Sequence, residues 1–272
     1  MTTTHDLTRI AEGREAEIYA WEDGAVLRLF RDARSGASLA NERRAMAAAR
    51  AVVPSVPAIL GEAEVDGRPG LIMERVDGPD LLTLLGSKPW RVWMIGTICG
   101  DQHARLHAAP APPELASARE SIGTHAAAVL PHLPAQIAEA ASRVLASAPD
   151  GNALLHGDFH PGNILLSSRG PVVIDWPNAT RGDPHADVAR TLLLVGGGAL
   201  PPGTPLVVRV GARVARKAVR AAYLRAYRRV RPLDMRLVER WLFVSAVERL
   251  AESIEEERPM LLRMLEEMYR RY

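Results

Sequence analysis

The sequence predicts an α+β protein with a small antiparallel sheet and one helix up to about residue 77 and a mainly helical part over residues 78–272. Two observations predict this arrangement. In the first part, short apolar segments alternate with glycine-containing turns, as in β-hairpins. In the second part, apolar residues recur every three or four positions, as in amphipathic helices.

Three antiparallel strands are expected within Leu7–Phe30, with turns at Gly13–Glu15 and Asp23–Gly24. A helix follows over Ser38–Arg50, because this segment is rich in strong helix formers and begins with a serine suited to an N-cap. Two further strands are expected on either side of Asp66–Gly67, a strong hairpin signal. These five strands complete the predicted sheet.

Helical patterns fill most of the remaining chain. They are expected over residues 80–86, 90–109, 117–129 and 135–147, followed by three helices between Pro205 and Tyr272 with breaks near Arg231–Pro232 and Arg258–Pro259. His103 and His107 stand four residues apart on the second of these helices, a spacing that zinc sites use. Because no HExxH motif or third ligand accompanies the pair, we expect His107 to face the core or a loop.

Composition excludes several classes of protein. The 272 residues carry 34 basic and 32 acidic side chains, so the formal net charge of +2 does not point to nucleic acid or an anionic membrane as a partner. Cys99 is the single cysteine, which excludes an intramolecular disulfide and a cysteine-cluster metal site. The longest apolar run, near Leu192–Leu200, is interrupted by three glycines, and the amino terminus lacks the apolar core of a secretory signal. We therefore expect a cytoplasmic protein and leave its oligomeric state open.

The stretch HGDFHPGNILLSSRGPVVID, from His156 to Asp175, carries the chemistry. Asp158 precedes Asn163 by five residues, and two apolar runs joined by a tight turn lead to Asp175. A hairpin returns Asn163 and Asp175 to one end, near Asp158. Asparagine and aspartate oxygens are hard ligands suited to Mg²⁺, and Asp158 is placed to accept a proton from an attacking hydroxyl.

This stretch, together with IDW and RGDPHADVART further on, resembles the signatures of the aminoglycoside phosphotransferase-like family of small-molecule kinases, which includes choline kinase-type enzymes. The resemblance extends loosely over nearly the whole chain. It implies a two-lobed protein-kinase-like fold and transfer of phosphate from ATP or GTP, with Mg²⁺, to a hydroxyl of a small molecule. It assigns catalysis to Asp158, metal binding to Asn163 and Asp175, and support of the catalytic loop to His156 and Asp187.

The resemblance also implies a nucleotide site in the first lobe. The turn at Gly13–Glu15 would lie over the phosphates, and backbone groups of Glu74 and Val76 would meet the purine edge, with Met73 beside the base. Two hairpin residues, Leu165 and Ile174, are assigned to the same site.

One position departs from the family pattern. The third strand of the family carries a lysine that holds the nucleotide phosphates, but this chain has Arg28 there, and its two lysines, Lys88 and Lys217, lie outside this lobe. Arginine keeps the charge but is bulkier and is not an equivalent point charge. We expect Glu42, one turn into the first helix, to pair with Arg28.

Two other functions remain open from the sequence. The missing lysine fits a nucleotide-binding pseudokinase that regulates a partner without turnover. A crowd of basic residues between Arg209 and Arg220 fits a nucleic-acid surface, although acidic residues follow and a solvated helix face is the simpler interpretation.

The acceptor is the least determined part of the prediction. The resemblance leaves antibiotics, with resistance as the consequence, beside choline, homoserine and sugars. The acidic cluster Glu252, Glu255, Glu256 and Glu257 would attract a cationic acceptor such as an aminoglycoside or a basic peptide antibiotic, or would simply lie on a helix surface.

Overall fold

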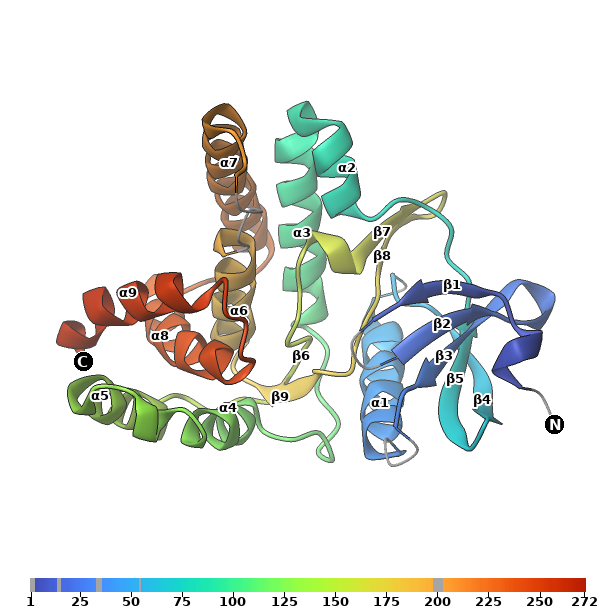
Figure 1. Ribbon diagram of the computed structural model, residues 1–272, viewed down its shortest axis with the longest axis horizontal. Coiled ribbons are helices and arrows are strands. Elements are labelled where there is room, and N and C mark those ends of the chain that lie inside the picture. The colour runs from blue at the N-terminus through green and yellow to red at the C-terminus, as the bar shows by residue number, and fades with distance from the viewer. Residues whose placement is uncertain (1–2, 14–15, 33–35, 54, 198–202) are drawn as a thin grey trace.

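The computed structural model describes residues 3–13, 16–32, 36–53, 55–197 and 203–272. It has the predicted α+β architecture, a five-stranded antiparallel sheet beside a mainly helical part (Figure 1). The sheet has the order β1-β2-β3-β5-β4. Its strands are β1 (Arg9–Glu12), β2 (Ala16–Ala20), β3 (Ala25–Phe30), β4 (Ile59–Val65) and β5 (Arg68–Glu74).

The sheet forms where the sequence alternates. In β3, Ala25, Leu27 and Leu29 are buried on one face, so Arg28 lies on the other face toward the helical part. The β4–β5 hairpin turns through Asp66 and Gly67, whose φ angles of 53° and 71° are those that a tight two-residue turn requires. The expected turn at Gly13–Glu15 includes residues 14 and 15, which lie outside the described residues.

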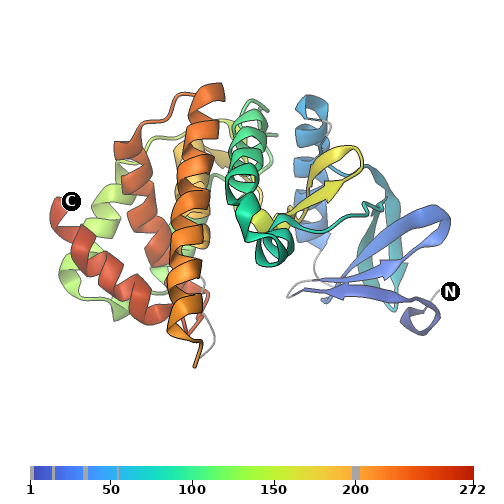
Figure 2. The same cartoon turned by 90° about the horizontal axis from the view of Figure 1, so that it is seen from above.

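Helix α1 (Gly36–Val52) begins two residues before the expected start, so the assignment of Ser38 as N-cap is wrong. The helix extends past the serine through Ala37, a strong helix former, to Gly36. The buried face of α1 carries Ala45, Met46 and Ala49, which belong to the main hydrophobic core formed with the helical part. Helix α1 thus packs against both parts of the protein (Figure 2).

The helical part holds the other eight α-helices of the described residues and two small two-stranded sheets. The helices are α2 (Leu81–Ser87), α3 (Val92–Leu106), α4 (Ala118–Ala127), α5 (Ala135–Ala146), α6 (Pro184–Gly196), α7 (Leu206–Val230), α8 (Met235–Ala251) and α9 (Arg258–Met268). The strands are β6 (Ala153–Leu155), β7 (Ile164–Ser167), β8 (Gly170–Val173) and β9 (Thr180–Gly182). The β7–β8 hairpin was expected, whereas the β6–β9 pair was not.

Helices α3 and α7 pack unusually closely, side by side in Figures 1 and 2. A Cβ atom on Gly96 would lie 2.6 Å from the Val219 carbonyl oxygen, and one on Gly100 would lie 2.2 Å from that of Tyr223. The two glycines therefore allow backbone contact between the helices. This approach carries the tyrosines of α7 to the histidines at the end of α3.

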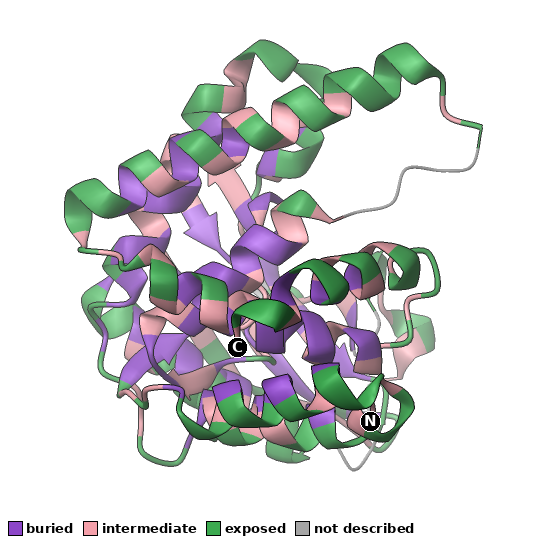
Figure 3. Cartoon of the chain, turned by 90° about the vertical axis from the view of Figure 1, so that its left-hand side faces the viewer, coloured by how far each residue is buried: buried purple, intermediate pink, exposed green. Residues whose placement is uncertain are grey.

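The helices are buried where they contact one another and exposed on their outer faces. Figure 3 shows purple, buried segments where the helices meet and green, exposed faces outside, with the first half of α7 largely exposed. Within the described residues, no helix has the length and apolar character needed to span a membrane.

Candidate active site

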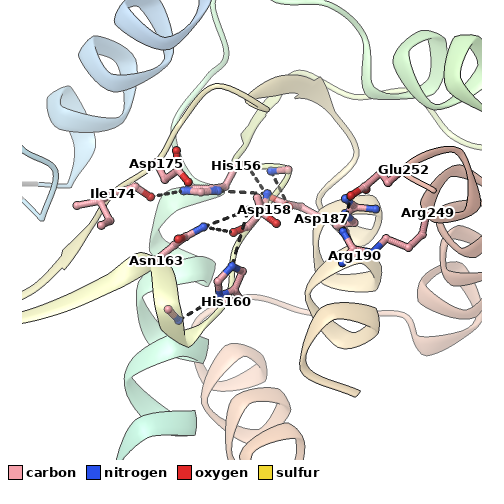
Figure 4. A network of polar contacts seen from close by, with 12 residues as sticks. His156, Asp158, His160, Asn163, Ile174, Asp175, Asp187, Arg190, Arg249 and Glu252 are labelled. Atoms are coloured by element: carbon pink, nitrogen blue, oxygen red, sulfur yellow. Dashed lines mark hydrogen bonds and ion pairs between the residues drawn. The ribbon is translucent and has the colours of Figure 1, made fainter. Parts of the chain in front are cut away.

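The loop between β6 and β7, which the sequence predicts to be the catalytic loop, holds His156, Asp158 and Asn163 (Figure 4). The amide nitrogen of Asn163 donates to the backbone oxygen of Asp158 at 2.9 Å and to its Oδ2 at 3.2 Å. Gly157 makes the bend with φ of 78°, and a Cβ atom there would lie 2.2 Å from the Asn178 carbonyl oxygen. Only glycine fits this bend, which sets the position of Asp158.

His156 braces the loop from inside. Its Nε2 donates to the Ile174 carbonyl oxygen at 3.0 Å, and its Nδ1 accepts from the Asp158 backbone N–H at 3.2 Å. These partners are an acceptor and a donor, so the ring carries its proton on Nε2. Burial lowers the pKa of His156, which keeps the ring neutral. The ring ties the catalytic loop to the strand end that leads to Asp175.

Asp187, in the first turn of α6, holds the backbone of this loop through its carboxylate. It accepts from the backbone N–H of His156 at 2.5 Å and from that of Gly157 at 3.0 Å. Asp183 caps the same helix by accepting from the His185 backbone N–H at 2.9 Å. Asp187 therefore has the structural position expected of it.

A buried histidine pair completes the support. His103 and His107 place Nε2 3.0 Å and 3.3 Å from Asp187 Oδ2, and their Nδ1 atoms each lie 2.7 Å from a tyrosine hydroxyl, those of Tyr223 and Tyr227. Burial lowers the pKa of both histidines, to about 4 for His107. Burial alone would raise the pKa of Asp187, but the neighbouring His103 and His107 outweigh it and hold that pKa well below its usual value.

The trio His103, His107 and Asp187 offers three metal-ligand atoms within 4.8 Å of one another. The sequence could not indicate Asp187 as a partner 80 residues away from this histidine pair. Every ring nitrogen of the pair nevertheless has a hydrogen-bond partner, so the cluster is complete as a neutral histidine and carboxylate network.

Asp175 follows the β7–β8 hairpin with φ of 68°, a left-handed conformation that costs a non-glycine residue about 1–3 kcal/mol. Such strain is concentrated at functional sites. The Oδ1 atom of Asp175 lies 2.9 Å from Arg28 Nη2, and Arg28 Nε donates to Glu42 Oε2 at 2.8 Å. The expected Arg28–Glu42 pair is therefore present, and it extends to Asp175.

This ion pair is shielded from solvent. The side chains of Arg28 and Glu42 are 11% and 1% exposed. Burial raises the pKa of Glu42; the Arg28 charge acts against this, and the Asp175 charge adds to it. The guanidinium of Arg28 is thus shared between two carboxylates.

The five residues assigned to the nucleotide base lie around the connection between the parts. Met73 and Glu74 end β5, Val76 lies in the connection itself, and Leu165 and Ile174 belong to or follow the β7–β8 hairpin. The connection runs along this hairpin, because the Leu166 N–H donates to the Pro79 oxygen at 2.9 Å. The Glu74 N–H donates to the Ala58 oxygen at 2.8 Å.

A cavity of about 980 Å³ opens beside the catalytic loop. Arg28, Asp158 and Asp175 line it, whereas Glu42, Asn163 and the five residues assigned to the nucleotide base do not. Its far wall is built from α4, α6 and α8 and includes Arg190 and Arg249, which the sequence did not single out. Their spacing along ordinary amphipathic helices offered no signal.

The carboxyl group of Asp158 is partly exposed in the cavity. Burial would raise the pKa of Asp158, but His160, with Nε2 3.7 Å from Oδ2, and then the more distant His156 and Arg190 lower it below the usual value. The carboxylate is therefore ionised at neutral pH. Its side chain is 24% exposed, so a ligand in the cavity can reach it.

The chain matches known proteins in fold and in sequence pattern. It resembles a solved amicoumacin kinase complex with AMP-PNP and Ca²⁺ (14% identity over 98% of this chain and 89% of that one, TM-score 0.64) and a GDP and kanamycin complex of an aminoglycoside phosphotransferase (17%, 97% and 92%, 0.58). It also resembles a putative fructosamine-3-kinase from Haemophilus somnus 129PT (15%, 96% and 90%, 0.60). At these identities the likeness shows the fold.

The sequences of curated proteins include none that matches this chain. The family model described as the phosphotransferase enzyme family matches residues 6–233, most of the chain. This protein therefore belongs to the phosphotransferase enzyme family, as an enzyme related to kinases of small-molecule hydroxyls.

Proposed function

We propose that the protein transfers the γ-phosphate of ATP or GTP to a hydroxyl of a small molecule, with Asp158 as the general base. The observation that carries this proposal is that Asp158, Asp175 and Arg28 line one cavity although they come from three separate segments. A proton acceptor, a metal-type carboxylate and a fixed positive charge are the groups that phosphoryl transfer needs.

In the proposed reaction, the acceptor hydroxyl oxygen forms a bond to the γ-phosphorus and the bond from that phosphorus to the nucleoside diphosphate oxygen breaks. The hydroxyl proton passes to Asp158. The lowered pKa of Asp158 keeps it in the accepting form, and the hydrogen bonds from Asn163 hold it in place. His156 and Asp187 fix the loop without contacting the reacting atoms.

The donor atoms fit a magnesium ion. The Asn163 carbonyl and the Asp175 carboxylate supply hard oxygen ligands from one end of the hairpin, and Mg²⁺ prefers few such ligands together with phosphate oxygens. When bound there, the ion neutralises charge on the transferring phosphate. Arg28, held by Glu42, adds a second positive charge beside Asp175.

For the nucleotide base we keep the assignment of Met73, Glu74, Val76, Leu165 and Ile174. Its support is the contact between the connecting segment and the β7–β8 hairpin, where the Leu166 N–H donates to the Pro79 oxygen and Leu165 pairs with Asp80.

The test is a coupled assay of nucleoside diphosphate release with ATP or GTP, Mg²⁺ and a range of hydroxylated acceptors. We expect Asp158→Asn to reduce acceptor-dependent turnover by about 10²–10⁴-fold with unchanged nucleotide affinity. Turnover that survives this substitution undiminished contradicts the mechanism.

A nucleotide-binding pseudokinase is the second candidate, favoured by the Arg28–Asp175 ion pair. This pair places a protein cation on the carboxylate that the metal needs. Thermal shift with nucleotide, with and without Mg²⁺, separates the candidates. Stabilisation by nucleotide that is independent of Mg²⁺, without turnover on any acceptor, favours the pseudokinase.

The acceptor candidates are an antibiotic, such as an aminoglycoside or a basic peptide, with resistance as the consequence, and a metabolite such as choline, homoserine or a sugar. Two of the four clustered glutamates, Glu252 and Glu257, are paired with arginines in the cavity wall. This removes much of the argument for a cationic acceptor.

A further inference from the structure

The cavity wall opposite the nucleotide side carries a chain of alternating charges. His125 Nδ1 lies 3.0 Å from Glu248 Oε1, and Glu248 Oε2 lies 3.9 Å from Arg190 Nη1. Arg190 Nη2 donates to Glu252, which also accepts from Arg249 Nη1 at 2.5 Å. We call this set, with Glu257 at its end, the charge ladder; its members are His125, Glu248, Arg190, Glu252, Arg249 and Glu257.

The charge ladder is close to neutral. Arg249 donates to the Glu257 carboxylate from Nε at 2.8 Å and from Nη2 at 3.1 Å. Glu252 accepts from Arg190 as well as from Arg249. The two guanidinium groups offset two of the three carboxylates. The third, that of Glu248, hydrogen-bonds His125 and raises the pKa of that histidine. Among the described residues, the wall therefore lacks the group of uncompensated carboxylates that a polycation needs.

The ladder lies next to the proposed base. Figure 4 shows Arg190, Arg249 and Glu252 on the side of Asp158 opposite Asn163 and Asp175. Arg190 and Asp158 line the same cavity. An acceptor whose hydroxyl reaches Asp158 therefore meets the ladder with the rest of its structure.

Two donors in this wall are not used by the protein. Ser245 is 1% exposed, and its Oγ has no hydrogen-bond partner among the described residues; the same holds for Arg190 Nη1. The 3.9 Å between Arg190 Nη1 and Glu248 Oε2 exceeds a hydrogen bond. A hydroxyl both accepts and donates, so one hydroxyl satisfies a guanidinium donor and a carboxylate acceptor together, whereas an ammonium group only donates.

We propose that the acceptor is a polyhydroxylated compound with at most one positive charge, a sugar or a single-amine sugar, and that Arg190 and Glu248 select it by binding hydroxyls beside the one that is phosphorylated. This inference rests on the proposed phosphotransfer. It separates this protein from an enzyme built for polycationic aminoglycosides.

The test compares two acceptor panels. One contains uncharged and singly charged compounds (myo-inositol, glucose, glucosamine), and the other contains polycations (neamine, kanamycin). Diphosphate release is measured at about 50 and about 300 mM KCl, because salt screens the binding of polycations. Binding of each compound in the presence of AMP-PNP is measured by calorimetry. We expect at least about tenfold higher kcat/KM for a member of the first panel, with less than about a twofold salt effect on its KM.

Arg190→Gln supplies a second measurement. Losing a charged hydrogen-bond partner should raise the KM of the polyol about tenfold or more with little change in kcat. The same substitution removes the positive charge beside Glu248 and Glu252, so neamine should bind more tightly. Arg143→Gln, at an exposed arginine of α5, is the matched control and should change neither value.

The outcomes are separable. Preference for the polycations, binding of neither panel, or an Arg190→Gln protein that folds and keeps its polyol KM overturns the present inference. Acceptor-dependent turnover that is unaffected by Asp158→Asn instead overturns the proposed function, whichever panel is preferred. A melting temperature and an AMP-PNP affinity equal to those of the unsubstituted protein show that Arg190→Gln is folded.

Discussion

Replacing Arg28 by methionine tests whether the arginine at the lysine position stabilises the fold as well as binding phosphate. The substitution leaves Glu42, 1% exposed, without its cation. Removing one partner of a buried ion pair costs about 3–5 kcal/mol. The second pair, to Asp175, adds at most about 1 kcal/mol, because that carboxylate is 37% exposed.

The lower end of this range is expected. Burial already raises the pKa of Glu42, so the isolated carboxyl takes up a proton rather than remaining charged, and this limits the penalty. A loss of about 3 kcal/mol corresponds to a fall in Tm of about 6–12 °C for a chain of this size. The double substitution Arg28→Met with Glu42→Met should recover much of the loss, because no charge is left buried.

Urea unfolding at pH 7 and pH 5 is the assay. A carboxyl whose folded pKa is raised contributes stability at low pH that is lost as pH rises through the folded value. The deficit of Arg28→Met should therefore shrink at pH 5. Arg43→Gln is the control, since its pair with Glu62 is half-exposed on both sides and should cost less than about 1 kcal/mol. A deficit for Arg28→Met below about 1 kcal/mol, unchanged with pH, refutes the reasoning.

Three further predictions concern the supports of the site. Burial lowers the pKa of His107 to about 4 in the folded state, against about 6.5 in the unfolded state, so its contribution to the free energy of unfolding is complete above pH 6.5 and falls by about 2 kcal/mol between pH 7.5 and pH 5. In urea unfolding, the free energy of the His107→Gln protein should lack this part of the pH dependence. Gly100→Ala should lower the free energy of unfolding by about 2 kcal/mol or more, because its Cβ would lie 2.2 Å from the Tyr223 oxygen, whereas Gly86→Ala, in open space, should be neutral or stabilising by calorimetry. Asp175→Asn should abolish the Mg²⁺-dependent part of the nucleotide thermal shift while leaving Tm within about 2 °C, since asparagine tolerates the left-handed conformation; an unchanged shift contradicts the metal assignment.

Local patterns predicted most of the fold. The alternating strands and the Asp66–Gly67 turn depend on neighbouring residues, and the structure contains them. The five-residue spacing of Asp158 and Asn163 is also local, and the two residues are joined by a hydrogen bond. The predicted start of α1 at Ser38 was wrong, because a serine favours an N-cap only where the residues before it do not continue the helix.

Partners distant in sequence could not be predicted. The β6–β9 pair has only three residues on each strand, too few for a visible alternation. The sequence suggested that the acidic cluster forms a free negative surface. The structure shows that arginines neutralise Glu252, and one of them, Arg190, lies 62 residues earlier in the chain. Periodicity shows which helix face is buried, but it does not show which helix lies opposite.

Helix α1 couples the folding of the sheet to that of the helical part. Its alanine and methionine face belongs to the core of the helical part, while Glu42 on the same helix holds Arg28 of the sheet. A fragment ending near residue 77 would therefore expose an apolar helix face, and the complementary fragment would have a hole in its core. The whole chain should melt in one transition, and a gene divided at this boundary should not give two soluble halves.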